Sequence, residues 1–128
     1  MDFAVFPRTW APALHAAIRI MTGLLFLEHG TGKLLGFPDL SAMKPMLGGL
    51  FLPTGLIELI GGALIVVGFF TRPTAFVLAG FCAVAYFMAH LPMGFFPALN
   101  HGEPAILFCF VFLYLAAVGP GPWAIDKD

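Results

Sequence analysis

Four apolar stretches, separated by breaks rich in proline and glycine, constrain the fold of this chain more than any other feature of its sequence. Each stretch approaches the roughly 20 mostly apolar residues with which a helix crosses a lipid bilayer. The stretches cover approximately residues 12–35, 50–70, 74–91 and 103–119. The sequence therefore predicts an all-α integral membrane protein, a bundle of four transmembrane helices in which residues 1–128 form one domain.

The composition also favours lipid over water as the solvent of this chain. Hydrophobic residues make up 60% of the sequence and charged residues 10%, whereas soluble domains carry about 25% charged residues. The formal net charge of −1 provides no basic surface, so we expect membrane lipid and no nucleic acid among the partners. The segment before Arg19 lacks the basic-then-apolar order of a secretory signal, so we expect it to remain uncleaved.

Basic residues near the ends of the four stretches indicate their orientation. Four crossings place Arg8, Arg72 and Lys127 on one side of the membrane, together with both termini, and leave Lys33 and Lys44 on the other. Cytoplasmic loops carry the excess of Lys and Arg in membrane proteins. We therefore expect both termini to lie in the cytoplasm.

Polar side chains recur along one face of the first predicted helix. Their spacing of three and four residues places them within about 40° of one line, at about 100° per residue. The face comprises His15, Arg19, Thr22, Phe26, His29 and Lys33. Ionisable groups in a spanning helix are costly outside the bundle interior, so this face is predicted to point inward. Glu28 lies about 140° from His15 on the same helix and is not explained by this face.

Glu58 lies about two turns inside the second predicted helix. A carboxylate at that depth needs a cation, and the first helix offers Arg19, His29 and Lys33 as alternatives. Further along the chain, histidines and an acid stand where the third and fourth helices meet the outer loop. The candidate polar core of the bundle comprises Arg19, His29, Lys33, Glu58, His90 and Glu103. The candidate helix-packing glycines, which let backbones approach closely, are Gly30, Gly61, Gly62 and Gly102.

Each of these groups also has a structural interpretation. Buried ion pairs fix helix pairing, and charges near helix ends reach the lipid headgroups. That interpretation is favoured for Glu28, Lys33 and His101, which lie near helix ends. For Arg19 and Glu58, which lie too deep to reach water easily, a functional role or at least an obligatory paired role is favoured instead.

Cysteine and metal chemistry receive little support from the sequence. Cys82 and Cys109 fall at comparable depths on the third and fourth helices, and without nearby charge both are predicted to be small buried hydrophobic residues. No His, Cys or carboxylate spacing typical of a metal site occurs within the helices. A haem between His29 and His90 is a minor alternative without a supporting motif. No catalytic residue is assigned.

Taken together, the polar positions resemble those of the DoxX family, which comprises small four-helix bacterial membrane proteins. The motifs run in order along nearly the whole chain: “R” at 19, “EHGTGK” at 28–33, “E--GG” at 58–62, “G--TR” at 68–72, “NHGE” at 100–103 and “GPGPWAID” at 119–126. The resemblance implies a protein of the bacterial cytoplasmic (inner) membrane. It also implies family positions at His29, Gly30, Lys33, Glu58, Gly61, Gly62, Arg72, Gly102 and Glu103, while His101 is an extra residue within the Asn-Gly-Glu motif.

Three functions remain open on this basis. The resemblance implies an association with quinone and thiol redox systems, and it favours a redox-associated subunit that binds a quinone and works with a redox partner protein. A small proton-coupled transporter with Glu58 as the titrating group is the second hypothesis. The third is a structural or assembly partner of a membrane complex. No self-contained catalytic motif identifies an enzyme, no bound cofactor is evident, and the sequence predicts no oligomeric state.

Overall fold

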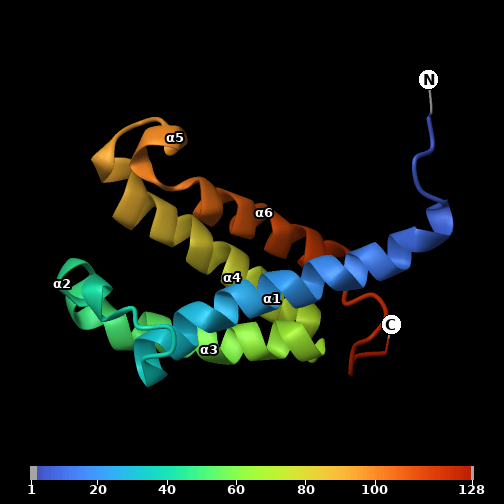
Figure 1. The fold of residues 1–128 in the computed structure, drawn as a ribbon, viewed down its shortest axis with the longest axis horizontal. Coiled ribbons are helices and arrows are strands. Elements are labelled where there is room, and N and C mark those ends of the chain that lie inside the picture. The colour runs from blue at the N-terminus through green and yellow to red at the C-terminus, as the bar shows by residue number, and fades with distance from the viewer. Residues whose placement is uncertain (1–2, 128) are drawn as a thin grey trace. The chain divides into compact units, whose positions relative to one another are not determined.

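The computed structural model describes residues 3–127, and all regular structure in that range is helical (Figure 1). The long helices are α1 (Ala11–Leu35), α3 (Phe51–Val67), α4 (Thr71–Ala85) and α6 (Glu103–Val118). The chain forms two compact units, which are described separately. The first unit contains residues 3–69 and 120–127, and the second contains Phe70–Gly119.

In the first unit, α1 and α3 lie side by side (Figure 1). α1 ends at Leu35. The next residue, Gly36, has a left-handed φ of 72°, and its N–H bonds the carbonyl of Thr31, as is common at helix C-termini. The connection to α3 is not a bare loop. It folds into three short helical pieces, Ser41–Met43, α2 (Lys44–Leu47) and Gly48–Leu50.

In the second unit, α4 packs against α6 (Figure 1). The two helices are antiparallel, because Arg72 at the start of α4 donates a hydrogen bond to the carbonyl of Val118 at the end of α6. α4 continues into a π-helical segment, Tyr86–His90, and a short 3₁₀ turn, Leu91–Met93. The four-residue helix α5 (Pro97–Asn100) then leads into α6.

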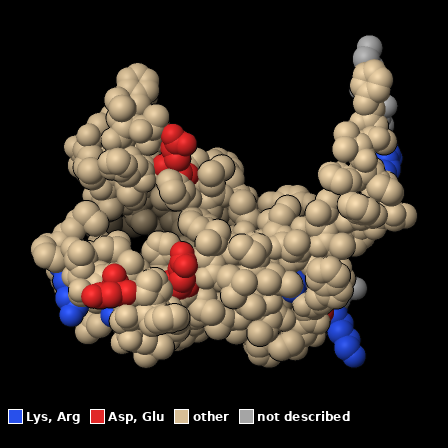
Figure 2. Space-filling model, in the orientation of Figure 1, with Lys and Arg blue, Asp and Glu red and all other residues tan. Residues whose placement is uncertain are grey.

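The cores of both units are narrow, and large apolar side chains cover their outer surfaces. The buried apolar residues are Ala16, Phe26, Phe51 and Ile65 in the first unit and Ala75, Leu78, Ala79, Cys82, Phe112 and Leu115 in the second. Many Phe, Leu, Val and Met side chains are exposed instead, and Figure 2 shows few charged groups on the face it draws. Apolar surface of this extent is expected where lipid is the solvent.

Three helical stretches within the described residues have the length and composition to cross a membrane. They are Arg8–Leu35, Ser41–Val67 and Thr71–Met93, with 28, 27 and 23 residues. α6 is apolar but has 16 residues, which span about 24 Å of a hydrocarbon layer about 30 Å thick. The structure thus supports an all-helical membrane protein with three helices of spanning length and a fourth, shorter apolar helix.

The predicted helices agree with the observed ones except near their ends. The second predicted helix extends to residue 70, but α3 ends at Val67 because Gly68 adopts a left-handed φ of 69°. The third helix begins at Thr71 rather than at residue 74, and its last turn is π-helical. The break predicted between the first two helices contains the short helices described above.

Candidate functional site

A buried ion pair joins α1 to α3. Lys33 Nζ lies 2.7 Å from Glu58 Oε1, and the two side chains are 4% and 8% exposed. Lys33 Nζ also donates a hydrogen bond of 3.0 Å to the hydroxyl of Thr54. Thr54 in turn donates to the carbonyl of Leu50, one turn earlier in the chain. The Lys33–Glu58–Thr54 cluster is therefore held by both helices.

Helical spacing explains how α3 presents two groups to one lysine. Thr54 and Glu58 are four residues apart, so they stand on the same face of α3. Gly55 lies beside them, and a Cβ there would be 3.0 Å from Lys33 Cβ. The absence of that side chain lets the lysine stem lie against the backbone of α3.

The cluster has hydrogen-bonding capacity that the described residues do not use. Among them, no hydroxyl or amide group donates to Glu58 Oε1, whose described partner is the Lys33 ammonium. The ammonium of Lys33 has three N–H groups, and its described partners are Thr54 and Glu58. The Lys33 ammonium and the Glu58 carboxylate thus keep hydrogen-bonding capacity for a ligand or a proton.

Glycines bring α1 and α3 into close contact around this cluster. A Cβ at Gly30 would lie 2.8 Å from Leu59 Cβ, and a Cβ at Gly62 would lie 2.6 Å from the backbone nitrogen of Leu27. Real Cβ atoms do not approach so closely, so the two backbones fit only without side chains at these positions. Gly61 is also buried in α3.

Arg19 is fully buried at the other end of the α1–α3 pair and does not contact Glu58. Its Nε donates a hydrogen bond of 3.1 Å to the carbonyl of Ile65. Its two terminal nitrogens donate to carbonyls of the C-terminal segment, those of Pro120, Pro122 and Trp123. Arg19 lies 14 residues before Lys33, or about 21 Å along the helix.

The C-terminal segment that Arg19 binds, residues 120–127, is called the C-terminal strap below. Its backbone N–H groups at Ile125 and Asp126 donate to the carbonyls of Val67 and Gly68, at 3.0 and 2.8 Å. Because the last carbonyls of a helix lack partners within that helix, the strap caps the end of α3. The Asp126 carboxylate also interacts electrostatically with Arg19.

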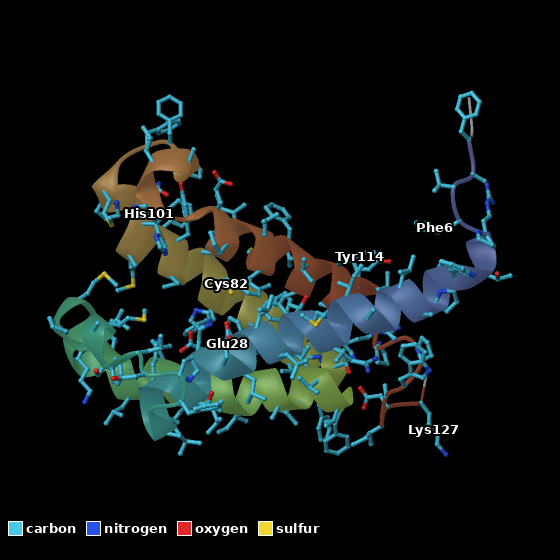
Figure 3. The ribbon with its side chains drawn as sticks, viewed as in Figure 1. Phe6, Glu28, Cys82, His101, Tyr114 and Lys127 are labelled. Atoms are coloured by element: carbon cyan, nitrogen blue, oxygen red, sulfur yellow. The ribbon has the colours of Figure 1, made fainter. Side chains whose placement is uncertain are left out.

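The remaining polar residues of α1 do not join the Lys33–Glu58–Thr54 cluster. His29 is half-buried, and its Nδ1 lies 2.9 Å from the carbonyl of Leu25 in the same helix. Glu28 is exposed on α1 (Figure 3). The backbone carbonyl of Glu28 accepts a hydrogen bond from the hydroxyl of Thr31.

In the second unit, Asn100 is the centre of a separate polar cluster. It is fully buried, and its side-chain nitrogen donates to Tyr86 Oη at 3.2 Å and to the carbonyl of Gly94 at 2.8 Å. Its side-chain oxygen accepts from the backbone N–H of Gly102 at 2.8 Å, and its carbonyl lies 3.0 Å from His90 Nδ1. A Cβ at Gly102 would lie 2.7 Å from Asn100 Oδ1. Asn100 therefore fixes the turn between α4 and α6.

Two residues near this turn lie at its surface. Glu103 is exposed in the first turn of α6, where a negative charge interacts favourably with the helix dipole. His101 is exposed as well (Figure 3) and adopts a left-handed φ of 60°. Cys82 and Cys109 of the same unit are present as thiols, the first buried and the second half-buried.

The candidate residues thus fall at three places in the described chain. Lys33 and Glu58 are brought together, Arg19 is bound to the C-terminal strap, and His90 contacts the Asn100 turn. Sequence reasoning placed Thr54 on the face of Glu58 and Asn100 within the “NHGE” motif without giving either a contact, and it did not single out Tyr86. The four-residue spacing from Thr54 to Glu58 carried a usable signal, whereas the carbonyl partners of Arg19 carried none, because every residue has a carbonyl.

Comparisons with known proteins agree with the membrane character of this chain. A family model described as DoxX matches residues 14–91. An uncharacterized protein of Haemophilus influenzae is 38% identical over 127 residues, which cover 92% of each chain. The “Inner membrane protein YqjF” of Escherichia coli (strain K12) is 33% identical over 120 residues, or 85% of this chain and 86% of the relative. No solved structure matches this chain.

Proposed function

We propose, because this chain belongs to the DoxX family, that it is a multi-pass inner-membrane protein that serves a quinone-linked redox system. In this proposal the chain binds the quinone headgroup and handles its protons, while a redox partner protein exchanges the electrons. The observation that carries the proposal is the buried Lys33–Glu58–Thr54 cluster and its unused hydrogen-bonding groups.

The cluster suits the proton chemistry of a quinone. Reduction of a quinone to a quinol consumes two electrons and two protons at its carbonyl oxygens. The remaining N–H of Lys33 would donate a hydrogen bond to one of these oxygens, and Glu58 Oε2 would accept a hydrogen bond from the quinol hydroxyl. A positioned carboxyl group can also act as the proton donor and acceptor for this step.

The same proposal includes four membrane crossings in one bundle. The C-terminal strap bonds the carbonyls at the end of α3, so the chain returns after α6 to the level at which α3 ended. The number of crossings between these points is therefore even, so α4 and α6 cross together or not at all, and the spanning length of Thr71–Met93 favours two crossings. Arg8, Arg72 and Lys127 then favour a cytoplasmic location for both termini.

The test is binding of a short-chain quinone analogue to detergent-purified protein. We expect Glu58→Gln and Lys33→Met each to weaken binding about tenfold, which corresponds to about 1.4 kcal/mol. Glu103→Gln makes the same chemical change at an exposed acid and is the matched control. Binding that is absent in the wild-type protein, or equal in Glu58→Gln and Glu103→Gln, would rule out the proposed site.

A proton-coupled transporter is the second candidate, and the isolation of Glu58 favours it. Within the described residues Glu58 is the one buried acid, and a single cation balances its charge. Protonation of Glu58 would release Lys33 and change the α1–α3 contact. Solute uptake into vesicles that follows an imposed pH gradient and is lost in Glu58→Gln would support transport over quinone binding.

An assembly role is the third candidate, and it draws on the hydrogen bonds of Arg19. A guanidinium that binds the carbonyls of three strap residues has the geometry of a structural anchor. Under this hypothesis the charges of the bundle serve only to hold the fold, so the double variant Lys33→Met, Glu58→Leu, which removes both charges of the buried pair, keeps the activity of its membrane complex as long as it inserts stably. Loss of that activity in a stably inserted double variant would exclude a purely structural role.

A further inference from the structure

The C-terminal strap has an inner face that is fully engaged with α1 and α3. Its carbonyls bind Arg19, and its N–H groups at Ile125 and Asp126 bind the end of α3. Ala124 packs so closely on Gly68 that a side chain there would collide with it. These contacts hold the strap over the end of α3.

The outer face of the strap has a different composition. Trp123 is 66% exposed and Ile125 is 59% exposed, and Lys127 extends away from the helices (Figure 3). Ala124 and Asp126, which alternate with them, are half-buried. Trp123 adopts a left-handed φ of 60°, which non-glycine residues usually avoid. The hydrogen bond from Arg19 to its carbonyl supports this conformation.

We propose that this outer face binds the headgroup layer of the membrane, with Trp123 and Ile125 at the acyl boundary and Lys127 on anionic headgroups. Tryptophan is enriched at this depth because its ring is apolar and its N–H is polar. Lysine next to the membrane surface is attracted to anionic lipids. The negative charge of Asp126 does not oppose this attraction strongly, because Arg19 balances it.

The position of the strap favours lipid as the occupant. The strap caps a helix of spanning composition, and such a helix ends where hydrocarbon gives way to headgroups. The proposal also sets the depth of Arg19 at the edge of the hydrocarbon, because its guanidinium bonds the carbonyl of Trp123. It is independent of the quinone proposal, since it concerns neither Lys33 nor Glu58.

The test uses tryptophan fluorescence in vesicles of phosphatidylcholine and phosphatidylglycerol. The chain has two tryptophans, so Trp10→Phe leaves Trp123 as the reporter. We expect lipids brominated near the headgroup to quench it about twofold more than lipids brominated near the chain end. Aqueous acrylamide should quench it only weakly.

Lys127 supplies a second, independent test on the surface of the folded protein. In the Trp10→Phe background, Lys127→Glu should reduce quenching by shallow bromines in anionic vesicles but not in vesicles of phosphatidylcholine alone. Lys44→Glu, which changes an exposed lysine of α2, should have no effect. Strong acrylamide quenching without bromine quenching would show a strap that faces water, and weak quenching by both acrylamide and the bromines would show a strap covered by protein. Stronger quenching by the deep bromines would place the strap in hydrocarbon, and any of these three results would overturn the proposal.

Discussion

At the scale of single residues, Lys33 and Glu58 depend on each other for their burial. Removal of one partner from a buried ion pair leaves an uncompensated charge, which costs about 3–5 kcal/mol, whereas an apolar replacement of both is often close to neutral. We therefore expect Lys33→Met or Glu58→Leu alone to be strongly destabilising, and the double variant to recover most of the loss. Unfolding in mixed micelles with increasing dodecyl sulfate measures these free energies. Additive losses in the double variant would contradict the coupling.

Asp39 lies outside the membrane-spanning segments, and its hydrogen bond with Ser41 is expected to depend on pH. The backbone N–H of Ser41 donates a hydrogen bond of 2.9 Å to the carboxylate of Asp39 and lowers the pKa of that carboxylate. A carboxyl pKa that is lower in the folded than in the unfolded state stabilises the fold at pH values above the unfolded-state pKa. This contribution disappears as pH falls through the lowered pKa of the folded state. We expect the protection of the Ser41 amide proton, measured by NMR as its exchange rate relative to the intrinsic rate at the same pH, to fall as pH drops through the lowered pKa of Asp39. Asp39→Asn, which keeps an acceptor but cannot titrate, should remove the pH dependence.

At the scale of elements, the contact between α1 and α3 depends on glycines whose hydrogen atoms face the opposite backbone. A Cβ at Gly62 would lie 2.6 Å from the backbone nitrogen of Leu27, so Gly62→Ala must push the helices apart. We expect a loss of about 1–3 kcal/mol from this overpacking. Gly80→Ala is the matched control in α4, because nothing lies within 4 Å of its new Cβ. It should stabilise the helix by about 0.5–1 kcal/mol, and equal losses at both positions in thermal unfolding would exclude the packing argument.

At the scale of the whole molecule, the sequence predicts the long elements better than the contacts between polar groups. Apolar length and proline or glycine breaks locate the long helices, and helical spacing predicts the face of α1 that buries Arg19 and Lys33. The partner of Glu58 remained open among three cations, because helical spacing does not determine the relative rotation and translation of two helices. The hydrogen bonds of Arg19 depend on where the backbone of the C-terminal strap returns. Residue type alone does not predict that path.

The crossing number of the whole chain gives the last prediction. The strap reaches the carbonyls of Val67 and Gly68, so we expect residues 120–127 and the beginning of α1 on the same side of the membrane. If the Thr71–Met93 stretch crosses, as its length allows, that arrangement requires α6 to cross as well. The 16 residues of α6 are short for the bilayer, which must thin or deform locally to accommodate them. Single cysteines at Thr9, Ser41 and Lys127, in a chain whose native cysteines are replaced by Ala, report the side by labelling with an impermeant maleimide. Thr9→Cys and Lys127→Cys should react from the cytoplasmic side and Ser41→Cys from the outside, whereas opposite labelling of the first two would mean that α6 does not cross.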